Sequence, residues 1–130
     1  MPDQTIDLFT ESIIGAAIEV HKALGPGLLE SAYESCLAFE LTQRGFDVIQ
    51  QHPLPLTYKA IKMDCGYRID LFVNHKVIIE IKSVQKILPI HEAQLMSYLK
   101  LSGCSVGLLL NFNSMRLIDG ITRRVMNHPE

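Results

Sequence analysis

Three charged residues stand where the hydrophobic pattern predicts the interior of a sheet. Asp70 is followed, after nine residues, by Glu80-Ile81-Lys82, which lies in a run of valine and isoleucine. Burying a charged group in a sheet is unfavourable unless the group is paired or binds a metal. Glu80 and Lys82 are two residues apart on one strand, so their side chains share a face of the sheet. The pattern therefore indicates a joint chemical role.

The loop between the two strands decides whether the acids meet. A three-residue loop at 74–76 pairs Asp70 with Glu80, and directly opposed residues have Cβ atoms roughly 5 Å apart on the same face. A two-residue loop instead pairs Asp70 with Ile79 and turns Glu80 to the other face. The chemical interpretation therefore requires an odd loop or a bulge.

Two adjacent carboxylates repel each other unless a cation lies between them. Carboxylate oxygens suit Mg²⁺ or Mn²⁺, and such an ion polarises a phosphoryl oxygen and lowers the pKa of bound water. Lys82 would orient the attacking water or stabilise negative charge in the transition state. Asp70, Glu80 and Lys82 with a divalent ion thus suit hydrolysis of a phosphodiester bond.

The elements that position these residues follow from hydrophobic periodicity. Helices are predicted at residues 13–24, 28–44 and 91–102, the first ended by Gly25-Pro26-Gly27 and the last by Gly103. Strands are predicted at residues 48–56, 67–73, 77–84, 106–112 and 117–125, with 56–61 as extended chain. This order predicts an α/β (α+β) fold with a central mixed β-sheet flanked by helices.

Length and composition limit the class of protein. A chain of 130 residues fits one domain spanning 1–130. Its net charge of −2 restricts any nucleic-acid contact to a local basic patch. The three cysteines form no CxxC motif, the N-terminus does not read as a signal peptide, and the apolar runs are too short for a membrane span. We expect a cytoplasmic protein without membrane partners.

The Asp70-x9-Glu80-x-Lys82 spacing, between a helical N-terminus and a later helix, resembles the PD-(D/E)xK nuclease superfamily. Ile69 stands where a proline usually precedes the aspartate. The segment Gly27-Leu28-Leu29-Glu30-Ser31-Ala32-Tyr33 matches GxxExxY, the signature of a small branch of that superfamily. The resemblance covers about residues 13–125, and it implies a restriction-endonuclease-like core and Mg²⁺ or Mn²⁺ as cofactor.

The same resemblance implies further site residues. Glu30 matches a first-helix acid that reaches the metal, so the implied metal ligands are Glu30, Asp70 and Glu80. Gln94-x-x-x-Tyr98 resembles the QxxxY motif of RecB-type nucleases, and residues four apart share a helix face. Gln94 would hold the ligand shell or the lysine, and Tyr98 would touch a phosphate. The predicted catalytic residues are Asp70, Glu80, Lys82, Gln94 and Tyr98.

Each functional interpretation has a structural alternative. Glu80 and Lys82 could form an ion pair at a sheet edge, and Glu30 could be an exposed acid that favours the helix dipole. Gln94 and Tyr98 could form an ordinary half-buried helix face. Tyr33 is predicted to pack in the core with its hydroxyl bonded, and His21 to be a satisfied core histidine.

The favoured function is a metal-dependent nuclease that hydrolyses DNA, with RNA as the less favoured substrate. The alternative is a non-catalytic module on the same fold, which binds nucleic acid or a protein partner without cutting. Phosphate-ester chemistry on a small molecule is less favoured, because the sequence has no glycine-rich loop for a nucleotide. The resemblance also implies a homodimer or a place in a larger complex.

Overall fold

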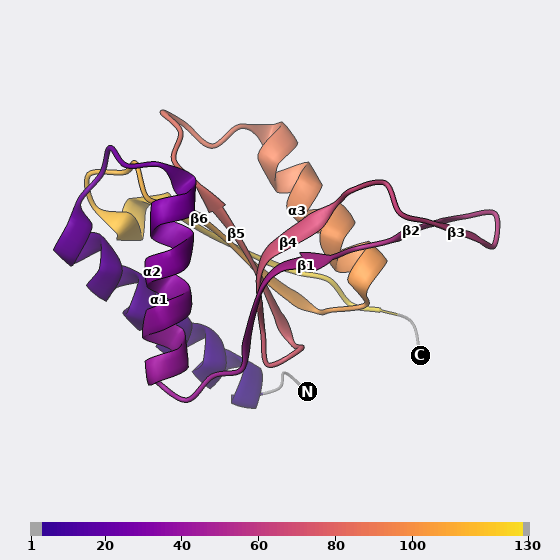
Figure 1. The fold of residues 1–130 in the computed structure, drawn as a ribbon, viewed down its shortest axis with the longest axis horizontal. Helices are drawn as coiled ribbons and strands as arrows, with labels where there is room; N and C mark the ends of the chain where they lie inside the picture. Colours follow the sequence, from indigo (N-terminus) through magenta and orange to yellow (C-terminus); the bar gives the residue numbers. More distant parts are fainter. Residues whose placement is uncertain (1–3, 129–130) are drawn as a thin grey trace.

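The computed structural model describes residues 4–128 as a mixed sheet between helices (Figure 1). The helices are α1 (Gln4–Leu24), α2 (Glu30–Gln43), α3 (Pro89–Ser102) and the short 3₁₀ helix η1 (Leu117–Gly120). The strands are β1 (Val48–Pro53), β2 (Leu56–Tyr58), β3 (Ile61–Met63), β4 (Arg68–Val73), β5 (Val77–Lys82), β6 (Val106–Asn111) and β7 (Ile121–Val125). Within these residues no helix is both long and apolar enough to cross a membrane.

The main sheet has the strand order β1-β4-β5-β6-β7. Strands β5 and β6 are parallel and are connected through α3, whereas the other neighbouring pairs are antiparallel. β5 is the central strand, and all of its residues are buried except the half-buried Lys82. The predicted α/β fold with a central mixed sheet flanked by helices is therefore confirmed.

Each face of the sheet is covered by helices (Figure 1). α1 and α2 cover one face, where Ile13, Leu37, Leu71 and Ile79 are among the residues of one apolar cluster. α3 covers the other face, where Leu95, Leu99 and Ile78 belong to a second cluster. Alternate side chains of β5 enter the two clusters, as expected for a strand buried on both sides.

The β4–β5 hairpin has the register that the chemical interpretation requires. Val73 pairs with Val77 and Leu71 pairs with Ile79, so the loop contains three residues. The same register places Asp70 opposite Glu80. Of the two loops that the sequence left open, the structure has the three-residue loop at 74–76 that the chemical interpretation requires.

Several segments differ from the sequence-based expectation. α1 begins at Gln4 rather than at residue 13, and β1 ends at Pro53 rather than at residue 56. Residues 56–61, expected to be extended, begin a second hairpin in which β2 and β3 pair, and this hairpin projects from the body (Figure 1). Its turn contains Lys59 and Ala60, both with positive φ, although such turns favour glycine and asparagine. The last predicted strand begins only at Ile121, because residues 117–120 form the 3₁₀ helix.

β5 also ends earlier than expected, at Lys82 rather than at Val84. The Asn111 side chain takes the place of a neighbouring strand there: its carbonyl accepts from the Val84 N–H at 3.1 Å, and its amide donates to the Val84 carbonyl at 2.9 Å. A side chain thus satisfies the backbone groups that follow the strand.

Tyr33 ties the loop between α1 and α2 to the core. Its ring is fully buried and stacks on Phe112 at 4.6 Å between ring centroids. Its hydroxyl donates to the Gly25 carbonyl at 2.5 Å and accepts from the Leu28 N–H at 3.1 Å. His21 is also buried, with Nε2 at 2.8 Å from the Ser114 carbonyl. Both residues are core residues with bonded polar atoms, as predicted.

The Tyr33 hydroxyl is expected to stabilise the fold through these two hydrogen bonds. Removing this hydroxyl with the Tyr33→Phe substitution should lower the free energy of unfolding by about 1–2 kcal/mol, measured by chemical denaturation. Tyr58→Phe is the matched control, because Tyr58 is exposed on the projecting hairpin. An equal effect of the two substitutions would contradict a role for the Tyr33 hydroxyl.

Candidate active site

The carboxylates of Asp70 and Glu80 each bind a backbone N–H of the neighbouring strand where β4 and β5 separate. Ladder pairing between the strands ends at Leu71 and Ile79. Beyond that point the Asp70 N–H donates to Glu80 Oε2 at 3.0 Å, and the Ile81 N–H donates to Asp70 Oδ2 at 2.8 Å. The two carboxylates therefore take the place of carbonyl acceptors in the ladder, and they lie together in the middle of the sheet.

Burial makes Glu80 the most perturbed acid of this pair. Glu80 is only 4% exposed to solvent. Desolvation, followed by the charge of Asp70, raises the pKa of Glu80 to about 8, and the Asp70 N–H and the Lys82 charge act against this rise. Without a cation, Glu80 thus retains a proton at neutral pH.

Lys82 is half-buried at the end of β5, and its charge stabilises the ionised form of Glu80. Its backbone carbonyl accepts from the Phe112 N–H at 2.9 Å, which fixes this end of the strand. Among residues 4–128 no ion pair joins Lys82 to Glu80. The alternative of an ion pair at a sheet edge does not describe this structure, because β5 is central.

A third acid, Glu34 of α2, approaches the pair through glutamine side chains of β1. Gln51 Nε2 donates to Glu34 Oε1 at 2.6 Å and to Asp70 Oδ1 at 3.1 Å. Gln50 Nε2 donates to the other Glu34 oxygen at 3.2 Å. The pKa of Glu34 is raised, and desolvation is the largest cause. The hydrogen bonds from the two glutamine amides lower this pKa, whereas the charges of Asp70 and Glu30 raise it further.

Glu34 and Gln51 are not among the site residues predicted from the sequence. Glu34 follows Glu30 by four residues and so shares its helix face, which was an available signal. Gln51 lies opposite Asp70 in the β1–β4 register, and its φ of 52° is in the left-handed region. A non-glycine residue held in that region is strained and is often found at a functional site.

Glu30 lies beside the site but is exposed. Its Oε2 accepts from the Ser83 N–H at 3.1 Å, one residue beyond Lys82. The Ser83 hydroxyl donates to the Leu28 carbonyl at 2.8 Å. The Gly27–Tyr33 segment therefore binds the residue that follows β5, and Glu30 contacts Ser83 rather than Asp70 or Glu80.

Gln94 and Tyr98 lie on α3, the helix that covers the face of the sheet carrying Ile78 and Glu80. Gln94 Nε2 donates to the Tyr98 hydroxyl at 3.3 Å, so the two side chains share a helix face. Tyr98 is only 5% exposed. Desolvation raises the pKa of Tyr98, and the nearby charges of Glu80 and Asp70 raise it further. Tyr98 is thus buried and Gln94 is half-buried on one side of α3.

The donor set fits a hard divalent cation at Asp70 and Glu80. Both side chains offer carboxylate oxygens, and the proton that Glu80 retains marks a position where a positive charge is favourable. Between residues 4 and 128 no group of three or more His, Cys, Asp or Glu side chains is arranged to hold a metal ion. The structure thus brings together two of the three predicted ligands, and Glu30 remains on Ser83.

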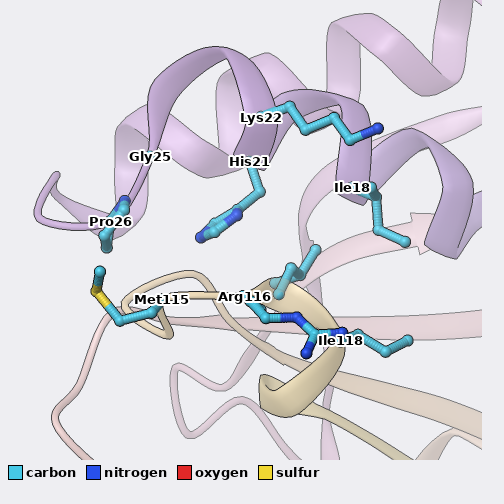
Figure 2. Close-up of a pocket in the computed structure, with 9 residues that line it drawn as sticks. Ile18, His21, Lys22, Gly25, Pro26, Met115, Arg116 and Ile118 are labelled. Atoms are coloured by element: carbon cyan, nitrogen blue, oxygen red, sulfur yellow. The ribbon is translucent and has the colours of Figure 1, made fainter.

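A separate cavity of about 480 Å³ lies between the end of α1 and the segment that leads into η1 (Figure 2). His21 points from α1 toward the segment that carries Met115 and Arg116 (Figure 2). No acid and no predicted site residue lines this cavity among the residues described for it. The chemistry of Asp70 and Glu80 is therefore not located there.

These features define an α/β protein that carries two acids and a lysine at the centre of its sheet. The chain belongs to the PD-(D/E)XK nuclease superfamily, whose family model matches residues 7–125. Proteins of this superfamily are typically nucleases and typically use divalent metal ions. Comparisons with curated proteins and with solved structures gave no significant match.

The raised pKa of Glu80 predicts how stability depends on pH when metal is absent. Below about pH 4.5 the carboxyl is protonated in both states, and between pH 4.5 and about 8 only the unfolded chain loses the proton. The free energy of unfolding should therefore fall over this range, by an amount on the order of a few kcal/mol. Glu80→Gln should remove this contribution.

The measurement is chemical denaturation in EDTA from pH 4 to pH 9, with wild type compared with Glu80→Gln. Glu34 contributes in the same direction, so the prediction concerns the difference between the two proteins. Glu11→Gln, an exposed change on α1, is the control and should follow wild type. A difference between wild type and Glu80→Gln that does not change with pH would contradict the prediction.

Proposed function

We propose that the protein is a metal-dependent nuclease of the GxxExxY branch that hydrolyses phosphodiester bonds in DNA. The observation that carries this proposal is the Asp70–Glu80 pair, in which each carboxylate binds a backbone N–H of the neighbouring strand. The buried Glu80 stands two residues before Lys82 on the central strand. Membership of the nuclease superfamily supports the reaction class. RNA is the second substrate class that the same chemistry would accept.

Asp70 and Glu80 would hold Mg²⁺ or Mn²⁺ through their carboxylate oxygens. A bound ion of this kind polarises a phosphoryl oxygen and lowers the pKa of water. Before an ion binds, Glu80 holds a proton near neutral pH, so it must give up this proton to act as an anionic ligand. Gln51 keeps Asp70 and Glu34 in place by donating to both carboxylates.

Lys82 would bring positive charge to the phosphate. It stands two residues after Glu80 on β5, and the two side chains share a face of that strand. An ammonium group that is already in position when the reaction starts stabilises the negative charge that develops as the phosphate is attacked. Tyr98, with its hydroxyl held by Gln94, closes the site from α3.

The direct test is cleavage of labelled single-stranded and duplex DNA and of RNA in Mg²⁺ or Mn²⁺. Asp70→Asn and Lys82→Ala should each reduce kcat by about 100-fold or more. Asn at position 70 retains an oxygen acceptor for the Ile81 N–H, so this variant should fold. Lys86→Ala, which changes an exposed lysine after β5, is the control and should retain activity.

Two results would contradict the nuclease proposal. One is activity in Asp70→Asn and Lys82→Ala equal to that of Lys86→Ala, which would place the chemistry elsewhere. The other is wild-type protein that cleaves none of the substrates with either metal. If that protein still binds nucleic acid or a protein partner, the non-catalytic alternative is the better description.

Metal binding can be tested without a substrate. Mg²⁺ should raise the melting temperature of wild-type protein, because a ligand that binds only the folded state stabilises it by about 2.7 kcal/mol at 100 times its Kd. Asp70→Asn should lose most of this rise, and Glu11→Gln should keep it. No rise in wild type, or an equal rise in Asp70→Asn, would contradict a metal site at this pair.

A further inference from the structure

A second cavity, of about 450 Å³, lies on the α3 side of the sheet, which is the side that carries Glu80. It lies between α3 and the chain at the root of the projecting β2–β3 hairpin. Among its lining residues are Leu56, Tyr67, Ile90, Gln94, Ser97 and Tyr98. Tyr98 connects the cavity to the acids, because it belongs to one apolar cluster with Ile69, the neighbour of Asp70, and with Ile78, which shares a face of β5 with Glu80. A ligand in this cavity would therefore lie next to the candidate active site.

The lining suits a flat, uncharged ligand that forms hydrogen bonds. The Tyr67 and Tyr98 rings meet edge to face, with centroids 6.1 Å apart and planes at 67°. Gln94 uses one N–H on the Tyr98 hydroxyl, and its amide also has a second N–H and a carbonyl oxygen. None of the residues described as lining the cavity is charged, so it offers a phosphate no cation.

We propose that this cavity binds an unstacked nucleobase of a single DNA strand, beside the phosphate that is cleaved. A nucleobase is planar and uncharged, and its edge carries the donors and acceptors that an amide recognises. In a duplex both faces of a base are stacked and its edge is paired, so only unpaired or frayed DNA can supply it. This inference rests on the proposed nuclease function and names its substrate class.

Tyr67 is the residue best suited to test the proposal. It is 43% exposed, so removing its ring should leave the fold intact. Tyr67→Ala should lower the ratio of kcat/KM for single-stranded over duplex DNA by about 10-fold, since stacking contributes at about this level per base. Tyr67→Phe keeps the ring and should keep the ratio. Tyr58→Ala removes an exposed tyrosine outside the cavity and is the control.

A second variant fills the cavity instead of removing part of its wall. Ala93 lies on the exposed side of α3 and lines the cavity, so Ala93→Leu should fold and should block a nucleobase. Ala93→Leu should therefore lower the ratio of kcat/KM for single-stranded over duplex DNA. Equal cleavage of the two DNA forms by wild type, or ratios in Tyr67→Ala and Ala93→Leu that match Tyr58→Ala, would overturn the nucleobase site while the nuclease function stands.

Binding without cleavage separates the two proposals. In EDTA, wild-type protein should change the emission of a single-stranded oligonucleotide that contains 2-aminopurine, and Tyr67→Ala and Ala93→Leu should weaken binding about 10-fold. This result supports the nucleobase site even if no substrate is cut. Unchanged binding, together with an altered oligomeric state of either variant in light scattering, would assign the cavity to contact between copies and overturn the proposal.

Discussion

The site depends on two hydrogen bonds between β4 and β5, from the Asp70 N–H to the Glu80 carboxylate and from the Ile81 N–H to the Asp70 carboxylate. Two carboxylates replace ladder carbonyls in the centre of a sheet, at the point where β4 and β5 separate. The arrangement costs stability, because Glu80 is desolvated next to another acid and its pKa rises to about 8. A purely structural pairing could be made by backbone carbonyls without this cost, so the arrangement supports the proposed cation site.

The surrounding elements hold this unfavourable arrangement in place from both sides of the sheet. On the α2 side, Tyr33 fixes the loop before the helix, and Glu30 and Leu28 hold Ser83 just after β5. Gln51 joins Glu34 to Asp70 with a strained backbone of its own. On the α3 side, Gln94 positions the Tyr98 hydroxyl. The main role of the GxxExxY segment in the structure is therefore to fix the end of the strand that carries Glu80 and Lys82.

Much of this arrangement was predictable from the sequence because it is local. The spacing of Asp70 and Glu80, together with a three-residue loop, is sufficient to pair the acids, and β5 has the apolar composition of a central strand. The role of Gln51 was not predictable in this way, since it depends on the long-range register of β1 against β4.

The departures from the expected fold have local causes. The Lys59-Ala60 turn lacks the glycine or asparagine that would have indicated a hairpin, so residues 56–61 looked like continuous extended chain. β5 looked longer than it is because Val84 is apolar, whereas its backbone is satisfied by the Asn111 side chain. Side-chain substitutes for ladder bonds leave little trace in a hydrophobic pattern.

The most direct measurement is a crystal structure of the wild-type protein soaked in Mn²⁺, with anomalous data. The account predicts a peak at about 2.0–2.2 Å from carboxylate oxygens of both Asp70 and Glu80, with Lys82 on the same side of the sheet. The contrary result is a map without a peak there, in which the Asp70 and Ile81 N–H groups keep their bonds to the two carboxylates at a saturating concentration of Mn²⁺.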